Sequence, residues 1–125
     1  KISLDSELTE KKITYHDPCY LGRYGKVFEP PRSLIRAIPE VDLVEMKRHH
    51  DYAWCCGHGA DMVNSVQPDL ASDIAEDRMA EAKESGAEAV ITTCPRCVQS
   101  LSSADRVMKV YDLTVAVARS MGLTV

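Results

Sequence analysis

The sequence lacks a hydrophobic run that approaches the length of a transmembrane helix, and no signal peptide is visible in it. We therefore expect no direct insertion of this chain into a membrane. It also lacks a strong basic excess: the formal net charge is -4, and the one short basic cluster, residues 47–50, is too small to form a convincing basic patch. We therefore expect no nucleic acid among its partners.

Internal repeats and low-complexity segments are also absent. The 125 residues are 45% hydrophobic and 27% charged, which is typical of one folded domain with a core of its own. We predict a polar linker or tail over residues 1–11 and a folded domain over residues 12–125. Because the chain begins with Lys1 rather than Met, we expect it to be a domain excised from a longer protein.

The number of cysteines in the chain is not even. The chain has 5, so a purely disulfide framework would leave one thiol over. The cysteines form an ordered set, consisting of a single residue, an adjacent pair and a Cys-x-x-Cys motif: Cys19, Cys55, Cys56, Cys94 and Cys97. Five thiols from three remote segments are the layout of a metal or iron–sulfur site, because soft thiolates suit iron–sulfur clusters and zinc.

The adjacent pair requires a bend in the backbone. Neighbouring side chains of a regular strand point to opposite faces, so Cys55 and Cys56 can converge only where the chain turns. Gly57 and Gly59 follow the pair and supply the conformational freedom for such a turn.

Strand and helix patterns alternate along the chain. Strands are predicted at residues 12–16, 41–46, 89–93 and 107–111, and helices at residues 30–38, 68–85, 95–104 and 113–121, with a loop at 20–28 and a helical turn at 62–66. This alternation favours an α/β fold, with a parallel sheet of about four strands and helices on both faces. Cys19 and Cys94 follow predicted strands, so the cysteine site is expected at the C-terminal ends of the strands.

The pattern resembles the CCG domain, the cysteine-rich module of the heterodisulfide reductase catalytic subunit and of iron–sulfur subunits of glycolate and lactate oxidation systems. The resemblance covers roughly residues 12–122. It includes the motifs His16-Asp17-Pro18-Cys19, Pro31-Arg32, Val44-Glu45-Met46, Cys55-Cys56-Gly57, Gly86-Ala87, Cys94-Pro95-Arg96-Cys97 and Asp112-Leu113. In this chain the glycine run after the pair is interrupted by His58 and continues as Ala60-Asp61.

The resemblance implies a Rossmann-like domain with its cysteines at one edge. It further implies that all five cysteines bind one noncubane [4Fe–4S] cluster, which would pass single electrons or take part in disulfide cleavage. The chain would then be a redox domain of a larger oxidoreductase, with a flavin or iron–sulfur electron donor as partner and without activity when isolated. Clusters that oxidise readily fit a reducing cytoplasm, with any attachment to a membrane made through a partner.

Other interpretations remain open at this point. Five thiols also suit a zinc-binding structural or docking domain without redox activity, and Cys94 with Cys97 could form a metal-free thiol–disulfide pair. The nearby residues can have structural roles. His58 can be hydrogen-bonded to backbone, and His16 can order the turn before Cys19. Trp54 can be a core anchor beside the site or a shield that keeps water from a cluster. Arg96 could lower thiol pKa values, face a partner or be solvated.

Overall fold

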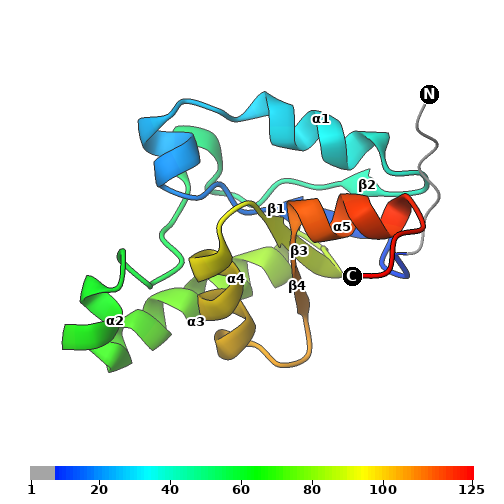
Figure 1. Cartoon of the computed structure of the whole chain (residues 1–125). Coiled ribbons are helices and arrows are strands. Elements are labelled where there is room, and N and C mark those ends of the chain that lie inside the picture. The colour runs from blue at the N-terminus through cyan, green and yellow to red at the C-terminus, as the bar shows by residue number, and fades with distance from the viewer. Residues whose placement is uncertain (1–7) are drawn as a thin grey trace.

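The computed structural model describes residues 8–125 and contains one sheet of four parallel strands (Figure 1). The strands are β1 (Lys12–Tyr15), β2 (Asp42–Leu43), β3 (Ala89–Thr92) and β4 (Lys109–Asp112), in the spatial order β2-β1-β3-β4. Residues 1–7, which make up most of the predicted tail 1–11, lie outside the described residues. The α/β fold with a four-stranded parallel sheet is confirmed.

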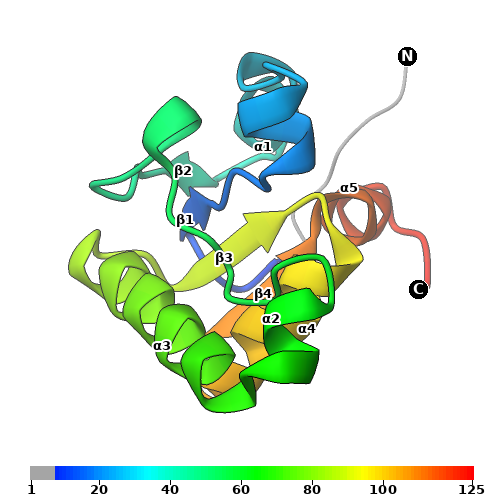
Figure 2. The ribbon, with the colours of Figure 1, turned by 90° about the vertical axis from the view of Figure 1, so that its left-hand side faces the viewer.

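Helices cover both faces of the sheet, as predicted. The α-helices are α1 (Glu29–Ala37), α2 (Met62–Val66), α3 (Pro68–Glu84), α4 (Pro95–Ala104) and α5 (Leu113–Ser120). Two short helices are added, the π-helix η1 (Tyr20–Tyr24) and the 3₁₀-helix η2 (His50–Tyr52). Helices α1 and α5 lie on one face and α3 and α4 on the other, while α2 extends beyond the sheet beside α3 (Figures 1 and 2).

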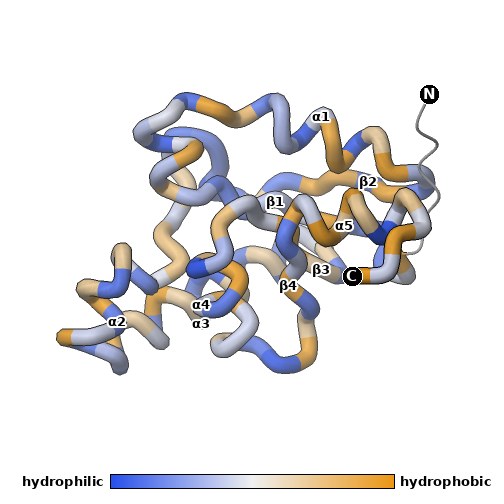
Figure 3. Tube along the Cα trace, in the orientation of Figure 1, coloured by the Kyte–Doolittle hydropathy of each residue, from blue (hydrophilic) through white to orange (hydrophobic). Residues whose placement is uncertain are grey.

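The strand residues divide the core between the two faces. Ile13 and Ile91 belong to the buried cluster under α1 and α5, whereas Val90 belongs to the cluster under α3 and α4. This division follows from the period of two in a strand. Hydrophilic and hydrophobic residues alternate along α1 and α5, as expected for helices with one buried face (Figure 3). Leu8, within the predicted tail, is buried in the first cluster.

The sheet reverses its direction of growth between β1 and β3. The chain moves outward from β1 to the edge strand β2, then returns to place β3 on the other side of β1. The helices that follow β1 and β3, α1 and α4, consequently leave toward opposite faces (Figure 2). In open α/β sheets, such a point opens a crevice beyond the C-terminal ends of the strands.

Three predicted elements differ in detail. The predicted strand 41–46 pairs with β1 over Asp42 and Leu43 alone, and Glu45 beyond it pairs with Arg32 of α1. The strand predicted at 107–111 begins two residues later, and the loop predicted at 20–28 contains η1. Asp112 caps α5, since its carboxylate accepts a hydrogen bond from Thr114 N at 2.8 Å. Within residues 8–125, none of the helices is both long and apolar enough to span a membrane.

Candidate metal centre

A single pocket at the crevice between β1 and β3 collects the cysteines. All five line it as free thiols: Cys19, Cys55, Cys56, Cys94 and Cys97. The pocket has a volume of about 270 Å³, whereas a cavity needs only about 10–15 Å³ to hold one water molecule. The donor set is rich in soft ligands and the space admits a group of many atoms, so the site fits a cluster as well as a single ion.

The segment after β1 brings Cys19 into the pocket. Asp17 anchors this segment, since its carboxylate accepts hydrogen bonds from Arg32 Nη1 at 2.8 Å and Nη2 at 2.7 Å. The same carboxylate accepts from the backbone N–H of His50 at 2.8 Å. Arg32 also donates to Glu45 from Nε at 2.6 Å. This buried network joins α1, the end of β1 and the segment that leads to the cysteine pair.

Gly57 makes the turn that lets Cys55 and Cys56 face one pocket. Its φ is 90°, and a Cβ at this position would lie 2.2 Å from the carbonyl oxygen of Ala71 in α3. A side chain is therefore excluded both by the backbone conformation and by the close approach to α3. The carbonyl of Cys56 accepts a hydrogen bond from Ser100 Oγ at 2.6 Å, which ties the pair to α4. The predicted bend at Gly57 is confirmed.

Helix α4 brings the Cys-x-x-Cys motif to the pocket. Cys94 is the residue before the first turn of α4, Pro95 opens the helix and Cys97 lies within the first turn, buried. Backbone N–H groups and the helix dipole place partial positive charge at this end of a helix. Such a helix end favours a negatively charged group held beside it.

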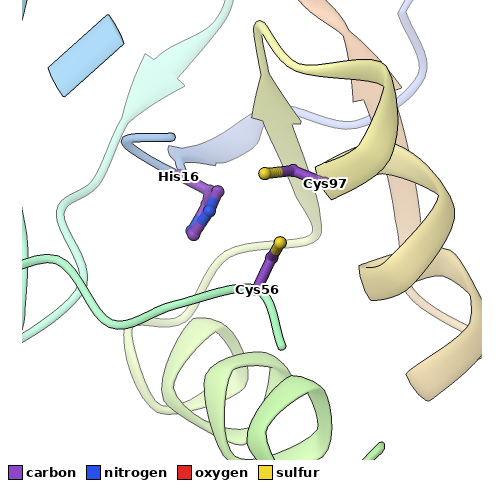
Figure 4. Close-up of side chains that lie close together, drawn as sticks. All are labelled: His16, Cys56 and Cys97. Atoms are coloured by element: carbon purple, nitrogen blue, oxygen red, sulfur yellow. The ribbon is translucent and has the colours of Figure 1, made fainter. Parts of the chain in front are cut away.

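His16, for which the sequence predicted only the ordering of a turn, lies at the pocket itself. One of its ring nitrogens and the sulfur atoms of Cys56 and Cys97 all lie within 4.8 Å of one another, and the three side chains converge in Figure 4. Its backbone is fixed by β3: His16 N donates to Ile91 O at 2.9 Å, and His16 O accepts from Thr92 Oγ1 at 3.0 Å. The signal that could have found it is its position at the end of a strand beside a cysteine.

Crowding of thiols keeps the pair protonated in the absence of a metal. Contact with the Cys56 thiol, and then burial, raise the pKa of Cys55 far above its ordinary value. The Cys55 thiol acts to lower the pKa of Cys56, but contact with Cys97 and burial outweigh it and raise that pKa to about 12. A bound metal would have to displace these protons, so metal uptake is expected to release them.

Burial makes His16 a neutral base. Burial first, and the charge of Arg78 second, lower its pKa well below the ordinary value for histidine. Arg78 comes from α3 and donates from Nε to His16 Nδ1 at 2.9 Å. Its Nη1 donates to Arg48 O at 2.8 Å and to Glu81 Oε2 at 3.1 Å. Arg78 was not among the predicted site residues, because nothing in its helical spacing distinguishes it from a solvated arginine.

The other candidate residues take modest roles. Trp54 lines the pocket with 40% of its surface exposed and stacks against the Arg48 guanidinium, so the core-anchor interpretation is wrong. His58 Nδ1 accepts from the backbone N–H of Asp61 at 3.1 Å, which confirms the predicted bond to backbone. Arg96 pairs with Asp61 Oδ2 at 3.0 Å across the pocket mouth.

A second group of metal-ligand type lies near the pocket but is already satisfied by hydrogen bonds. It consists of Glu45, His49 and His50. Glu45 is held by Arg32, the two histidines share a hydrogen bond between their Nδ1 atoms at 2.7 Å, and His50 Nε2 bonds Glu29 at 3.1 Å. These contacts account for the group without an ion.

Comparisons with known proteins identify the cysteine pattern. Residues 13–102 match the model of the CCG cysteine-rich domain. Over 129 aligned residues the chain is 40% identical to one of the subunits of the dihydromethanophenazine:CoB–CoM heterodisulfide reductase of Methanosarcina acetivorans, an alignment that covers 100% of this chain and 31% of the relative.

Two further relatives have other names. The chain is 35% identical to the probable iron–sulfur-binding oxidoreductase FadF of Bacillus subtilis, over 87% of this chain and 16% of the relative. It is 36% identical to one of the subunits of the CoM/CoB fumarate reductase of Methanothermobacter marburgensis, over 69% of this chain and 17% of the relative. The chain thus spans a third or less of these relatives, and it belongs to the CCG cysteine-rich domain family.

Proposed function

We propose that this chain is an iron–sulfur redox domain of a larger oxidoreductase, and that Cys19, Cys55, Cys56, Cys94 and Cys97 hold one noncubane [4Fe–4S] cluster. The convergence of all five free thiols on one pocket carries the proposal. The names of the relatives support it, because they describe iron–sulfur-binding and heterodisulfide-reducing proteins. The cluster would supply the transfer of single electrons.

The remaining residues of the site hold and screen the thiols. Asp17 and Arg32 fix the segment of Cys19, and Gly57 turns the pair toward the pocket. The start of α4 brings Cys94 and Cys97 to it. Five thiolates exceed the four that a zinc or cubane site uses. This excess favours a noncubane cluster over structural zinc.

The larger assembly is also part of the proposal. The chain covers a fraction of each relative, and the relatives include named subunits, so we place it beside other domains or subunits that carry a flavin or a further iron–sulfur donor. Its substrate would be a disulfide or a 2-hydroxy acid oxidised through that partner. Any association with a cytoplasmic membrane would be made through the partner.

Anaerobic reconstitution tests the proposal. The 125-residue chain is purified without oxygen, incubated with ferrous iron and sulfide, and analysed for metal content and by EPR. We expect about four irons per chain and a spectrum unlike that of a cubane cluster. A single zinc ion, with no iron even after reconstitution, would overturn the redox function and leave a structural domain.

Single serine substitutions test the ligand set. Each of the five cysteines is replaced in turn, and Ser103→Ala, on α4 but outside the pocket, is the control. All five serine variants should lose iron or change the EPR spectrum, while the control retains both. A cysteine whose replacement changes neither quantity is not a ligand.

A further inference from the structure

We propose that His16 donates a hydrogen bond to sulfur at the Cys56–Cys97 side of the pocket, and that Arg78 fixes the His16 ring for this role. This hydrogen bond raises the reduction potential of the group held there. This inference rests on the proposed function, because the potential in question belongs to the cluster proposed above. It concerns two residues that are almost wholly buried: His16 and Arg78 each expose 1% of their surface.

The contact with Arg78 determines which nitrogen of His16 carries the proton. A guanidinium has N–H donors and no acceptor. His16 Nδ1 therefore accepts the bond from Arg78 Nε with its lone pair, and the neutral ring carries its proton on Nε2. Among residues 8–125, Nε2 has no hydrogen-bond partner of its own, although the ring lines the pocket. Nε2–H is thus the donor that the ring can offer to a group in the pocket.

The same contact argues against His16 as a metal ligand. A histidine that binds a metal through one nitrogen usually donates its other ring N–H to a carboxylate, carbonyl or water. In this chain the other nitrogen meets a donor. To bind a metal through Nε2, the ring would have to lose its last proton or break the bond to Arg78. The arrangement therefore leaves metal binding to the thiolates and gives His16 the part of donor.

Arg78 is held so that it cannot turn away from the ring. Its Nη1 bonds the carbonyl of Arg48 and the carboxylate of Glu81, while Nη2 is buried without a hydrogen-bond partner among the described residues. A guanidinium fixed in this way keeps its positive charge beside Nδ1, in a ring that has one nitrogen within 4.8 Å of the sulfur atoms of Cys56 and Cys97. Because reduction adds negative charge to the cluster, a donor to its sulfurs stabilises the reduced form and raises the potential.

Three variants of the full 125-residue chain test the effect on potential. His16→Leu removes the donor, and His16→Gln replaces it with an amide N–H. The control is His49→Leu, which replaces a histidine outside the pocket by leucine. Each is reconstituted with iron and sulfide and titrated by EPR-monitored redox potentiometry. We expect the midpoint potential of His16→Leu to shift in the negative direction, that of His16→Gln to shift less, and that of His49→Leu to match the unaltered chain.

The outcomes separate this inference from the proposed function. A His16→Leu variant that binds the normal amount of iron at an unchanged potential overturns the donor role alone. Loss of iron from a His16→Leu variant with unaltered circular dichroism makes His16 a ligand and also overturns that role. Absence of iron in every variant, including the unaltered chain, overturns the proposed function itself and the donor role with it.

A second measurement needs neither metal nor substitution. The metal-free chain is labelled with ¹⁵N-histidine, and long-range ¹H–¹⁵N correlations report which ring nitrogen of His16 is protonated. We expect a neutral ring at pH 7 with the proton on Nε2. A proton on Nδ1, or a charged ring, would contradict the contact with Arg78 and overturn the inference even if the leucine variant failed to fold.

Discussion

The two largest side chains that the described fold buries completely are arginines, Arg32 and Arg78. Both lie behind the cysteine pocket rather than in an apolar cluster, and both are held by several hydrogen bonds. A buried charge is tolerated only when it is paired and bonded. The charges around this pocket therefore order the segments that carry the thiols.

Removing Arg32 should be costly because it leaves two carboxylates without their partner. In Arg32→Met, the buried Asp17 and the partly buried Glu45 lose an ion pair, and we expect the free energy of unfolding to fall by about 3–5 kcal/mol. Arg36→Met makes the same change four residues further along α1, at an exposed pair with Glu29, and should leave stability unchanged. Urea unfolding of the metal-free variants gives both values, and equal stabilities would contradict the network.

The interactions of Glu81 predict how the free energy of unfolding depends on pH. Burial alone would raise the pKa of Glu81, but hydrogen bonds from the backbone and guanidinium of Arg48 and from Arg78 outweigh it and lower the pKa below its ordinary value. A lowered folded-state pKa contributes stability above the unfolded-state value of about 4.3, and that contribution is lost as the pH falls through the folded-state value.

Replacement of Glu81 should remove this part of the pH dependence. We expect Glu81→Gln to be less stable than the unaltered chain at pH 7 and to lose less stability between pH 5 and pH 3. Urea unfolding across this range measures both slopes, with Glu84→Gln, at the end of the same helix, as the control. Parallel slopes for Glu81→Gln and the unaltered chain would exclude Glu81 as a source of acid sensitivity.

The sequence was enough to predict the cysteines of the site, but not the buried arginines that hold the surrounding segments. A cysteine pair and a Cys-x-x-Cys motif are rare enough to be recognised from sequence. Arg32 and Arg78 meet Asp17 and His16 across 15 and 62 residues, respectively, and no periodicity in the sequence marks either contact. Such partners depend on tertiary structure, which single-sequence patterns do not contain.

At the scale of elements, the turn after the cysteine pair holds two residues in conformations that glycine prefers. Ala60 and Asp61 have φ values of 53° and 73°. The left-handed region costs a residue with a Cβ roughly 1–2 kcal/mol. The interrupted glycine run of this sequence therefore carries backbone strain beside the pocket.

Restoring glycine should relieve part of that strain. We expect Ala60→Gly to raise the free energy of unfolding by up to about 1 kcal/mol, since the gain exceeds the added chain entropy of the unfolded state. Ala80→Gly, at an exposed position inside α3, should lower it by about 1 kcal/mol. Thermal or urea unfolding compares the two, and a destabilised Ala60→Gly variant would contradict the assigned strain.

The elements themselves were largely predictable, and their ends were not. The clear helical spacing and the proline at position 68 predicted α3 closely, because both are local signals. The end of β2 is one example: β1 continues to Tyr15, yet the strand pairing stops at Leu43, and Val44 N donates one further hydrogen bond to Ile13 O at 2.9 Å. Beyond this end Glu45 accepts a hydrogen bond from Arg32, 13 residues away, and no local pattern in the sequence marks such a contact.

At the scale of the whole molecule, the pocket joins segments that lie far apart in the sequence and that the fold alone brings together. A metal that binds these thiols in the folded state, and not in the unfolded chain, stabilises the fold by mass action. We therefore expect the reconstituted chain to unfold at a higher temperature than the metal-free chain, as measured by circular dichroism without oxygen. Removal of the metal by a chelator should return the midpoint to the metal-free value, and equal midpoints before and after removal would count against a bound metal that bridges these segments.

The placement of β3 beside β1 has a consequence for the order of events during synthesis. The first thiol of the pocket leaves the ribosome long before the last two, which lie beyond β3 at the start of α4. Until β3 has emerged and inserted next to β1, the nascent chain offers separated thiols and no enclosed pocket. Delivery of a prosthetic group to this domain therefore follows the synthesis of all the segments that carry its thiols, and the open thiols need protection from oxidants until then.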